Sequence, residues 1–306
     1  MKEELQRFCE YVNGEHTPLG YDSTASFYRN AIEESFVRQF TDKGDNQERN
    51  DLRVSSLGKP CVLQSLKLLG YSEPAPERKM RFVFHLGDIF EAYITLLAKT
   101  YGFEVITPQA EVNFHKVLGH IDFIVRSPES GEMAIIELKT MSGSYWNKFH
   151  SAYQGEYFAK EDVRSDTRGY LAQAAIYSHC IGLPIYWIVM DKSRNLTHLV
   201  QPIQENLDEA LLKAEKIVPK LRSIETFDDI LKNFKAPPGV PEFIGRGRNR
   251  EPTGNYTLVE AMQYSPFRHI FYDLTNAKKW NEQIEYIVAY RTPEEAKEVF
   301  EEMTNG

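Results

Sequence analysis

The spacing of apolar residues changes from a helical to a strand period after Gly102, and this change constrains the fold more than any other feature. Before it, residues 82–101 place apolar side chains at helical intervals. After it come three short segments rich in Val, Ile and Phe, at 103–115, 119–126 and 133–140, separated by turn-forming residues. We therefore expect a helix followed by an antiparallel meander of three strands.

A second helix and a fourth strand follow the meander. The helix is expected at 167–181, because Gly182 and Pro184 close it, and the apolar run 185–190 predicts the strand. The order helix, three strands, helix, strand places the chain in the α/β class. Residues 236–254, rich in Pro, Gly and Arg, are expected to form a loop.

These patterns divide the 306 residues into three parts. Residues 1–51 are expected to form an N-terminal helical extension, 52–204 the α/β core, and 205–306 a C-terminal helical and loop appendage packed on the core. No stretch approaches the roughly 18 apolar residues of a membrane span, so no membrane association is expected. The N-terminus lacks the apolar region of a secretory signal, which predicts a cytoplasmic location.

The formal charge is −8, from 36 basic and 44 acidic residues. This balance gives the molecule no global positive field that would attract nucleic acid, but a local groove can still be basic.

An acid and an amine lie side by side in the third predicted strand. Because side chains alternate along a strand, Ile135, Glu137 and Lys139 share one face. Burying either charge alone costs several kcal/mol, so a buried pair would need a function. The alternative is an ordinary ion pair on a solvated face, because the pattern E-x-K is common.

Two further acids are predicted near this pair. Asp122 lies on the second strand, one hairpin away from Glu137, and Glu91 lies on the preceding helix. Three converging carboxylates would repel unless a hard divalent cation sat between them, and oxygen ligands suit Mg²⁺ or Mn²⁺. Lys139 beside such an ion could position or activate a water.

Asp122, followed fifteen residues later by Glu137-Leu138-Lys139, resembles the signature of the PD-(D/E)XK nucleases. The chain resembles most specifically their RecB-type and phage lambda exonuclease-like branch, over residues 52–192. The matching segments are Ser55-Ser56-Leu57-Gly58-x-x-Cys61, Gly87-x-x-x-Glu91, Gly119-x-Ile121-Asp122, Glu137-Leu138-Lys139-Thr140 and Gln173-x-x-x-Tyr177. Each motif alone is unspecific, and their order is the specific signal.

The resemblance implies a restriction-endonuclease-like core with helical additions, and hydrolysis of DNA phosphodiesters with one or two Mg²⁺ or Mn²⁺ ions. It assigns Lys139 as the catalytic lysine and the Leu138 carbonyl as a further metal ligand beside the three acids. Gln173 and Tyr177 would support the scissile phosphate or the metal-bound water.

The resemblance favours an exonuclease or end-processing enzyme. It would act on linear or single-stranded DNA ends in recombination, repair or phage DNA metabolism, in a bacterial or phage-infected cell. A homo-oligomer or a recombination partner protein stays open.

Cysteine usage departs from one part of this family. Some of its members bind an iron–sulfur cluster through one cysteine before the core and three after it. Here Cys61 lies near the first position, but no cysteine follows residue 192. We therefore predict no cluster, and expect Cys61 and Cys180 to be buried apolar residues.

Candidate DNA contacts lie around the predicted core. Residues 141–165 are rich in aromatic side chains that could stack on bases, with lysines for phosphates, and 246–250 is a basic run. The candidate residues are Tyr145, Trp146, Lys148, Arg164, Arg168, Arg246 and Arg248. A lid packed on the core and a solvated loop are the plainer alternatives. His120 shares a strand face with Asp122, and a structural histidine is the preferred interpretation.

Three other functions were weighed from the same residues. The first is a structure-specific or restriction-type endonuclease, and the second is a catalytically silent DNA-binding module of the same fold. The third is a metabolic α/β enzyme with a coincidental E-x-K, which would require a cofactor fingerprint that the sequence lacks.

Overall fold

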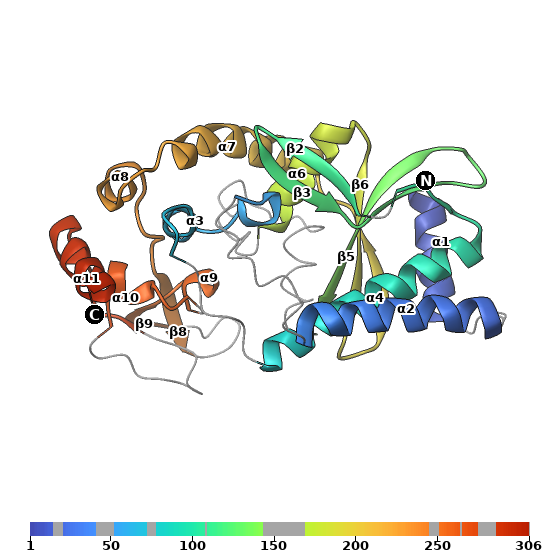
Figure 1. Ribbon diagram of the computed structural model, residues 1–306, viewed down its shortest axis with the longest axis horizontal. Helices are drawn as coiled ribbons and strands as arrows, with labels where there is room; N and C mark the ends of the chain where they lie inside the picture. Colours follow the sequence, from blue (N-terminus) through green and yellow to red (C-terminus); the bar gives the residue numbers. More distant parts are fainter. Residues whose placement is uncertain are drawn as a thin grey trace. The chain divides into compact units, whose positions relative to one another are not determined.

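A computed structural model gives the fold, which is mixed α/β as the sequence predicts (Figure 1). The structure describes residues 1–14, 21–40, 52–71, 78–107, 109–142, 169–244, 251–263, 265–274 and 286–305. The chain separates into two compact units. The first comprises Met1–Glu48, Pro74–Ser165 and Leu171–Leu212, and the second comprises Arg49–Glu73, Asp166–Tyr170 and Lys213–Gly306.

Long helices flank the sheet of the first unit, and α2 and α4 lie side by side (Figure 1). The helices are α1 (Lys2–Asn13), α2 (Tyr21–Phe40), α4 (Arg78–Tyr101), α6 (Tyr170–Ile181) and α7 (Gln204–Arg222), the last of which continues into the second unit. Helix α4 begins four residues earlier than predicted. It ends as expected before Gly102, whose φ of 111° lies in the left-handed region that glycine adopts without strain.

The central sheet of this unit has five strands in the order β1-β4-β5-β6-β7. They are β1 (Glu104–Val105), β4 (Phe123–Arg126), β5 (Met133–Met141), β6 (Ile185–Asp191) and β7 (Leu196–Val200). All neighbours are antiparallel except β5 and β6, because α6 carries the chain back between them as a crossover connection. Strand β7 was not predicted.

The first two predicted strands are each broken in the structure. Strands β2 (Ala110–Phe114) and β3 (Val117–Ile121) form a separate hairpin, while β1 and β4 belong to the central sheet. The breaks fall before Gln109, whose φ is 55°, and at Asp122 between β3 and β4. The strands predicted at 103–115 and 119–126 are therefore each interrupted, but the two segments still pair antiparallel on both sides of the interruption.

One face of the central sheet forms the core of the first unit. Apolar side chains of α1 and α4 cover it, among them Phe8, Ile94 and Leu97, and they pack against Ile136 and Leu138 of β5. Because strand side chains alternate, Glu137 and Lys139 are left on the opposite face of β5.

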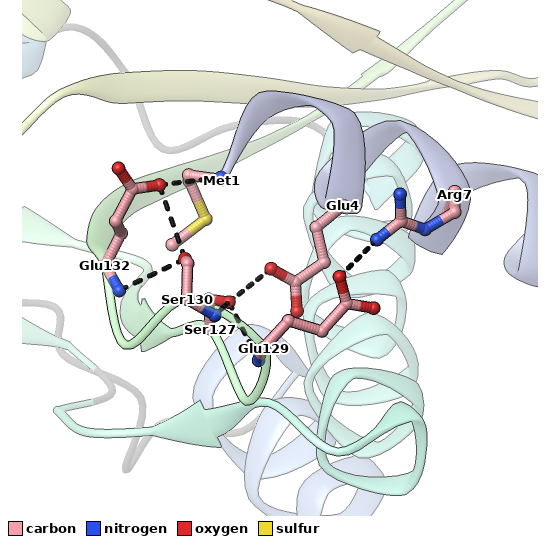
Figure 2. Close-up of polar contacts among 7 residues, drawn as sticks. All are labelled: Met1, Glu4, Arg7, Ser127, Glu129, Ser130 and Glu132. Carbon is pink, nitrogen blue, oxygen red and sulfur yellow. Dashed lines mark hydrogen bonds and ion pairs between the residues drawn. The ribbon is translucent and has the colours of Figure 1, made fainter.

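Helix α1 is attached to the turn between β4 and β5 (Figure 2). The buried Glu4 carboxylate accepts a short hydrogen bond from the Ser127 hydroxyl, and Arg7 binds Glu129 at 2.6 Å. The α-amino group of Met1 binds Glu132 Oε2 at 2.7 Å. These contacts hold the first helix over the sheet.

The second unit contains short helices and two small sheets. Its helices are α3 (Cys61–Leu68), α8 (Phe227–Asn233), α9 (Glu260–Gln263), α10 (Arg268–Phe271) and α11 (Pro293–Asn305), with a 3₁₀ turn at Val54–Ser56. Its strands are β8 (Val240–Ile244), β9 (Glu251–Thr257), β10 (Tyr272–Asp273), β11 (Tyr286–Ile287) and β12 (Ala289–Tyr290), paired in the orders β11-β9-β8 and β10-β12.

The loop predicted at 236–254 is wrong, because β8 and the start of β9 lie within it. Pro241 is tolerated because β8 is an edge strand, and the pairing is irregular between Pro241 and Phe243. The proline content thus predicted a loop where the structure has two antiparallel strands.

The second unit has a hydrophobic core of its own. Val62 and Leu66 of α3 pack with Ile230 of α8, and Phe227 stacks on Phe300 of α11 with ring centroids 4.0 Å apart. The predicted division into 1–51, 52–204 and 205–306 stays a prediction, although α3, which it assigns to the α/β core, packs in the second unit.

The cysteines differ from expectation. Cys180 is exposed, because it lies on the outer face of the last turn of α6, and Cys61 is half-buried. Cys9 is the buried one, and burial raises the pKa of its thiol to about 12. In the described part of the chain, no helix is both long and apolar enough to cross a lipid bilayer.

Candidate functional site

Strand β5 places an acid and an amine inside the protein, on the sheet face opposite α1 and α4. The side chain of Glu137 is 1% exposed and that of Lys139 is 12% exposed. Lys139 Nζ donates to Glu137 Oε2 at 2.7 Å. The alternative of a solvated surface ion pair is therefore wrong.

Asp122 joins this pair from the junction between β3 and β4. The register of the β4–β5 hairpin, with Phe123 opposite Ile136, brings Asp122 beside Glu137. The Asp122 amide donates to Glu137 Oε1 at 3.4 Å, and the Leu138 amide donates to Asp122 Oδ2 at 2.6 Å. Side chains thus replace ladder hydrogen bonds where β3 leaves the sheet.

The two carboxylates destabilise each other's charge. Burial raises the pKa of Glu137, the negative charge of Asp122 raises it further, and the Lys139 ammonium opposes both effects. Burial also raises the pKa of Asp122, against the charge of Lys139 and the amide of Leu138. Lys139 thus opposes the raised pKa of both acids, but burial is the larger effect at each of them.

Helix α6 supplies Gln173 and Tyr177, which are one turn apart and both buried. Gln173 Nε2 donates to the Tyr177 hydroxyl at 3.1 Å, and this hydroxyl donates to the His120 carbonyl at 2.7 Å. Burial, followed by the charge of Glu137, raises the pKa of Tyr177. The Tyr177 hydroxyl is thus hydrogen-bonded to β3, the strand that ends just before Asp122.

Glu91 is linked to Asp122 through an intervening residue, Gln109. Its Oε1 accepts from Gln109 Nε2 at 2.6 Å, and the Gln109 amide donates to the Asp122 carbonyl at 3.0 Å. Among the residues that the structure describes, no three His, Cys, Asp or Glu side chains are grouped so that they could hold a metal ion. The structure thus places Asp122 and Glu137 together and links Glu91 to Asp122 through Gln109, and the three-acid ligand set stays a prediction.

Sequence reasoning missed Gln109. Its role depends on a left-handed φ of 55° where the first strand segment breaks. Pro108, which directly precedes it in the sequence, is the signal that could have located this break, because proline is confined to strand edges, strand starts and bulges.

The other predicted contacts divide into described and undescribed residues. The His120 side chain is half exposed and lies 3.9 Å from Glu111 across the β2–β3 hairpin, whereas its carbonyl belongs to the Tyr177 network. The candidates that lie outside the described residues are Tyr145, Trp146, Lys148, Arg164, Arg168, Arg246 and Arg248.

No family model and no curated protein matches the sequence. Among solved structures, a crystal structure of SSO0001 is 16% identical, with coverage of 69% of this chain and 92% of that chain and a TM-score of 0.35. The alkaline exonuclease LHK-Exo from Laribacter hongkongensis is 10% identical, with coverage of 62% and 93% and a TM-score of 0.35. LHK-Exo in complex with dAMP is 12% identical, with the same coverage and a TM-score of 0.36. Similarities of this size do not establish a shared fold.

Proposed function

We propose that this protein is a metal-dependent nuclease that hydrolyses DNA phosphodiester bonds on a restriction-endonuclease-like core. One observation carries the proposal: Asp122, Glu137 and Lys139 meet in a largely buried cluster at a strand break. Such a cluster costs stability, and divalent-ion-assisted attack on a phosphodiester would use all three groups.

The donor set fits Mg²⁺ or Mn²⁺. Asp122 and Glu137 are hard oxygen donors whose mutual repulsion a dication would remove, and neither thiol nor imidazole side chains belong to the cluster. We propose that Asp122, Glu137 and the Leu138 carbonyl would hold one or two such ions. Glu91, which binds Gln109 at the edge of the site, would contribute a further carboxylate ligand. An iron–sulfur cluster is not part of the proposal.

The chain's own groups have distinct tasks in this proposal. A bound dication would supply Lewis acidity and lower the pKa of a bound water. The Lys139 ammonium binds Glu137 and also acts on the charge of Asp122, so in this proposal it would position the attacking water or stabilise the charge that develops on the phosphate. Gln173 and Tyr177 border the cluster and support its geometry.

Further parts of the proposal concern the substrate. We favour an exonuclease or end-processing enzyme that acts on linear or single-stranded DNA ends in the cytoplasm, in recombination, repair or phage DNA metabolism. Tyr145 and Trp146 would stack on bases. Lys148, Arg164, Arg168, Arg246 and Arg248 would bind phosphates. Endonuclease action and silent DNA binding are the alternatives that the following experiment separates.

The test incubates labelled linear and covalently closed DNA with Mg²⁺, with Mn²⁺, or with EDTA. We expect loss of linear DNA only when a metal is present, and nicking of closed circles would instead indicate an endonuclease. Binding without cleavage in either metal would overturn the enzymatic proposal.

Lys139→Ala should reduce cleavage at least about a hundredfold, because the group that holds the water or phosphate is lost. The control Lys192→Ala removes an exposed lysine from the β6–β7 turn and should cleave normally. Retained turnover in Lys139→Ala would reject the role of this lysine.

In calorimetry with Mn²⁺, Asp122→Ala should lose binding, and unchanged affinity would reject the metal site.

A further inference from the structure

Gly87 is an unexplained residue in the middle of helix α4. Glycine lowers helix stability relative to alanine, so its presence in a helix interior requires a reason. The described structure supplies none, because the Gly87 backbone is helical and a Cβ atom added there would meet nothing within 4 Å. Gly87 is therefore partly exposed, and no described atom lies within 4 Å of the position that a Cβ would take.

Gly87 lies on the same side of α4 as an aromatic and an acidic residue. Phe84, Gly87 and Glu91 follow one another at i, i+3 and i+7, so they form one stripe along α4. The Phe84 ring is 44% exposed, and Glu91 is linked through Gln109 to Asp122. The stripe thus runs from an exposed aromatic ring, over Gly87, to the edge of the acidic cluster.

The charge at the start of the helix favours an anionic occupant. The first turn of α4 holds no acidic residue, and the N-terminal end of a helix carries partial positive charge. An extended anion that approached the cluster along α4 would therefore meet positive charge, then the aromatic ring, then the glycine.

We propose that the stripe Phe84–Gly87–Glu91 is a substrate-strand seat, in which Gly87 lets the sugar–phosphate backbone of a single nucleic-acid strand contact the helix and Phe84 stacks on a base. This inference rests on the proposed nuclease function and names the element that guides the substrate to it. Base stacking on an aromatic ring is tolerant of sequence, as contacts of a general nuclease must be.

The experiment adds bulk at Gly87 and measures stability and binding separately. Gly87→Ala and Gly87→Gln should both raise the melting temperature slightly, because each residue favours the helix more than glycine does. Affinity for a fluorescent single-stranded oligonucleotide, measured with Ca²⁺ in a Lys139→Ala background, should fall in the order Gly, Ala, Gln. Phe84→Ala should weaken the same binding by about fivefold to a hundredfold.

Thr100→Gln is the matched control, since it adds similar bulk to an exposed position of α4 off the stripe. It should leave affinity unchanged. In the cleavage assay without the Lys139 substitution, Gly87→Gln should raise KM more than it lowers kcat. Unchanged affinity and KM in Gly87→Gln, with normal cleavage by the unsubstituted protein, would overturn the seat and leave the nuclease proposal standing. Absence of any cleavage by the unsubstituted protein would instead remove the premise.

Discussion

At the scale of single residues, the cluster around Glu137 is a site where the protein gives up stability. Its two acids are taken out of water and share one ammonium, an arrangement that apolar residues of similar volume would usually improve. The hydrogen bonds from the Asp122 and Leu138 amides fix the geometry of the acids without neutralising them. A bound cation would remove the repulsion between the two acids, as the proposed metal site requires.

The stability of the metal-free protein should fall as pH rises from about 4.5 to about 8 because of Glu137. Burial and the charge of Asp122 raise its pKa from the usual 4.5 to about 8. Across this window the unfolded chain releases a proton that the folded chain retains, so folding loses stability as pH increases. Urea unfolding at several pH values in EDTA should show a flatter slope for Glu137→Gln. The exposed Glu111→Gln serves as the control, and equal slopes in both variants would contradict the prediction.

Tyr177→Phe should destabilise the protein by about 1–3 kcal/mol and weaken Mn²⁺ binding. The substitution leaves the His120 carbonyl and the Gln173 amide without their hydroxyl partner next to Asp122. Urea unfolding and calorimetry with Mn²⁺ measure the two effects. Tyr186→Phe removes a hydroxyl from the opposite face of the sheet and should change Mn²⁺ affinity little. Equal Mn²⁺ affinity in all three proteins would show that Tyr177 supports only the fold.

At the scale of elements, the first helix and the β4–β5 turn depend on each other. Ser127 is the shared residue, because its hydroxyl donates to Glu4 and accepts from the amides of Glu129 and Ser130 (Figure 2). The turn therefore holds its own conformation and α1 through one oxygen. Since β5 begins directly after this turn, the contact also fixes the start of the strand that carries Glu137.

Ser127→Ala should cost about 2 kcal/mol and increase amide exchange in α1. It leaves the buried Glu4 carboxylate without its donor and two turn amides without their acceptor. Urea unfolding and hydrogen exchange measure the change. Ser130→Ala, in the same turn but exposed, should cost less than about 0.5 kcal/mol. Equal costs in the two variants would show that the Glu4 contact adds nothing.

At the scale of the whole molecule, each of the two units has a hydrophobic core among its described residues. One lies between the central sheet and helices α1 and α4, and the other joins α3, α8, α10 and α11. The chain enters the second unit three times, at 49–73, 166–170 and 213–306. Of these segments, the first contributes Val62, Leu63 and Leu66 to the core of the second unit.

Phe300→Ala should open a cavity against Phe227 and cost the second unit about 3–5 kcal/mol. Hydrogen exchange should show lost protection in α8 and α11 first, because the central sheet has a separate core. Ile244→Ala, at an exposed position of β8, is the control and should change little. Uniform loss of protection over both units would show that they unfold as one.

The sequence by itself determined the elements whose signal is local. The helical period fixed α4 and its end at Gly102, and alternation on β5 put Glu137 and Lys139 on one face. Asp122 was placed beside Glu137 correctly, because a single hairpin joins their strands and its register follows from alternation. These inferences require only near neighbours in the chain.

The tertiary structure alone decided what depends on contacts between distant segments. The strand breaks at Gln109 and Asp122 lie where the β2–β3 hairpin leaves the central sheet. At this place Gln109 binds Glu91, so Gln109 lies between Glu91 and Asp122. The hydrogen bond from Tyr177 to the His120 carbonyl forms because α6 lies against that break. The packing of α3 in a second core depends on residues more than 150 positions away, which no local spacing encodes.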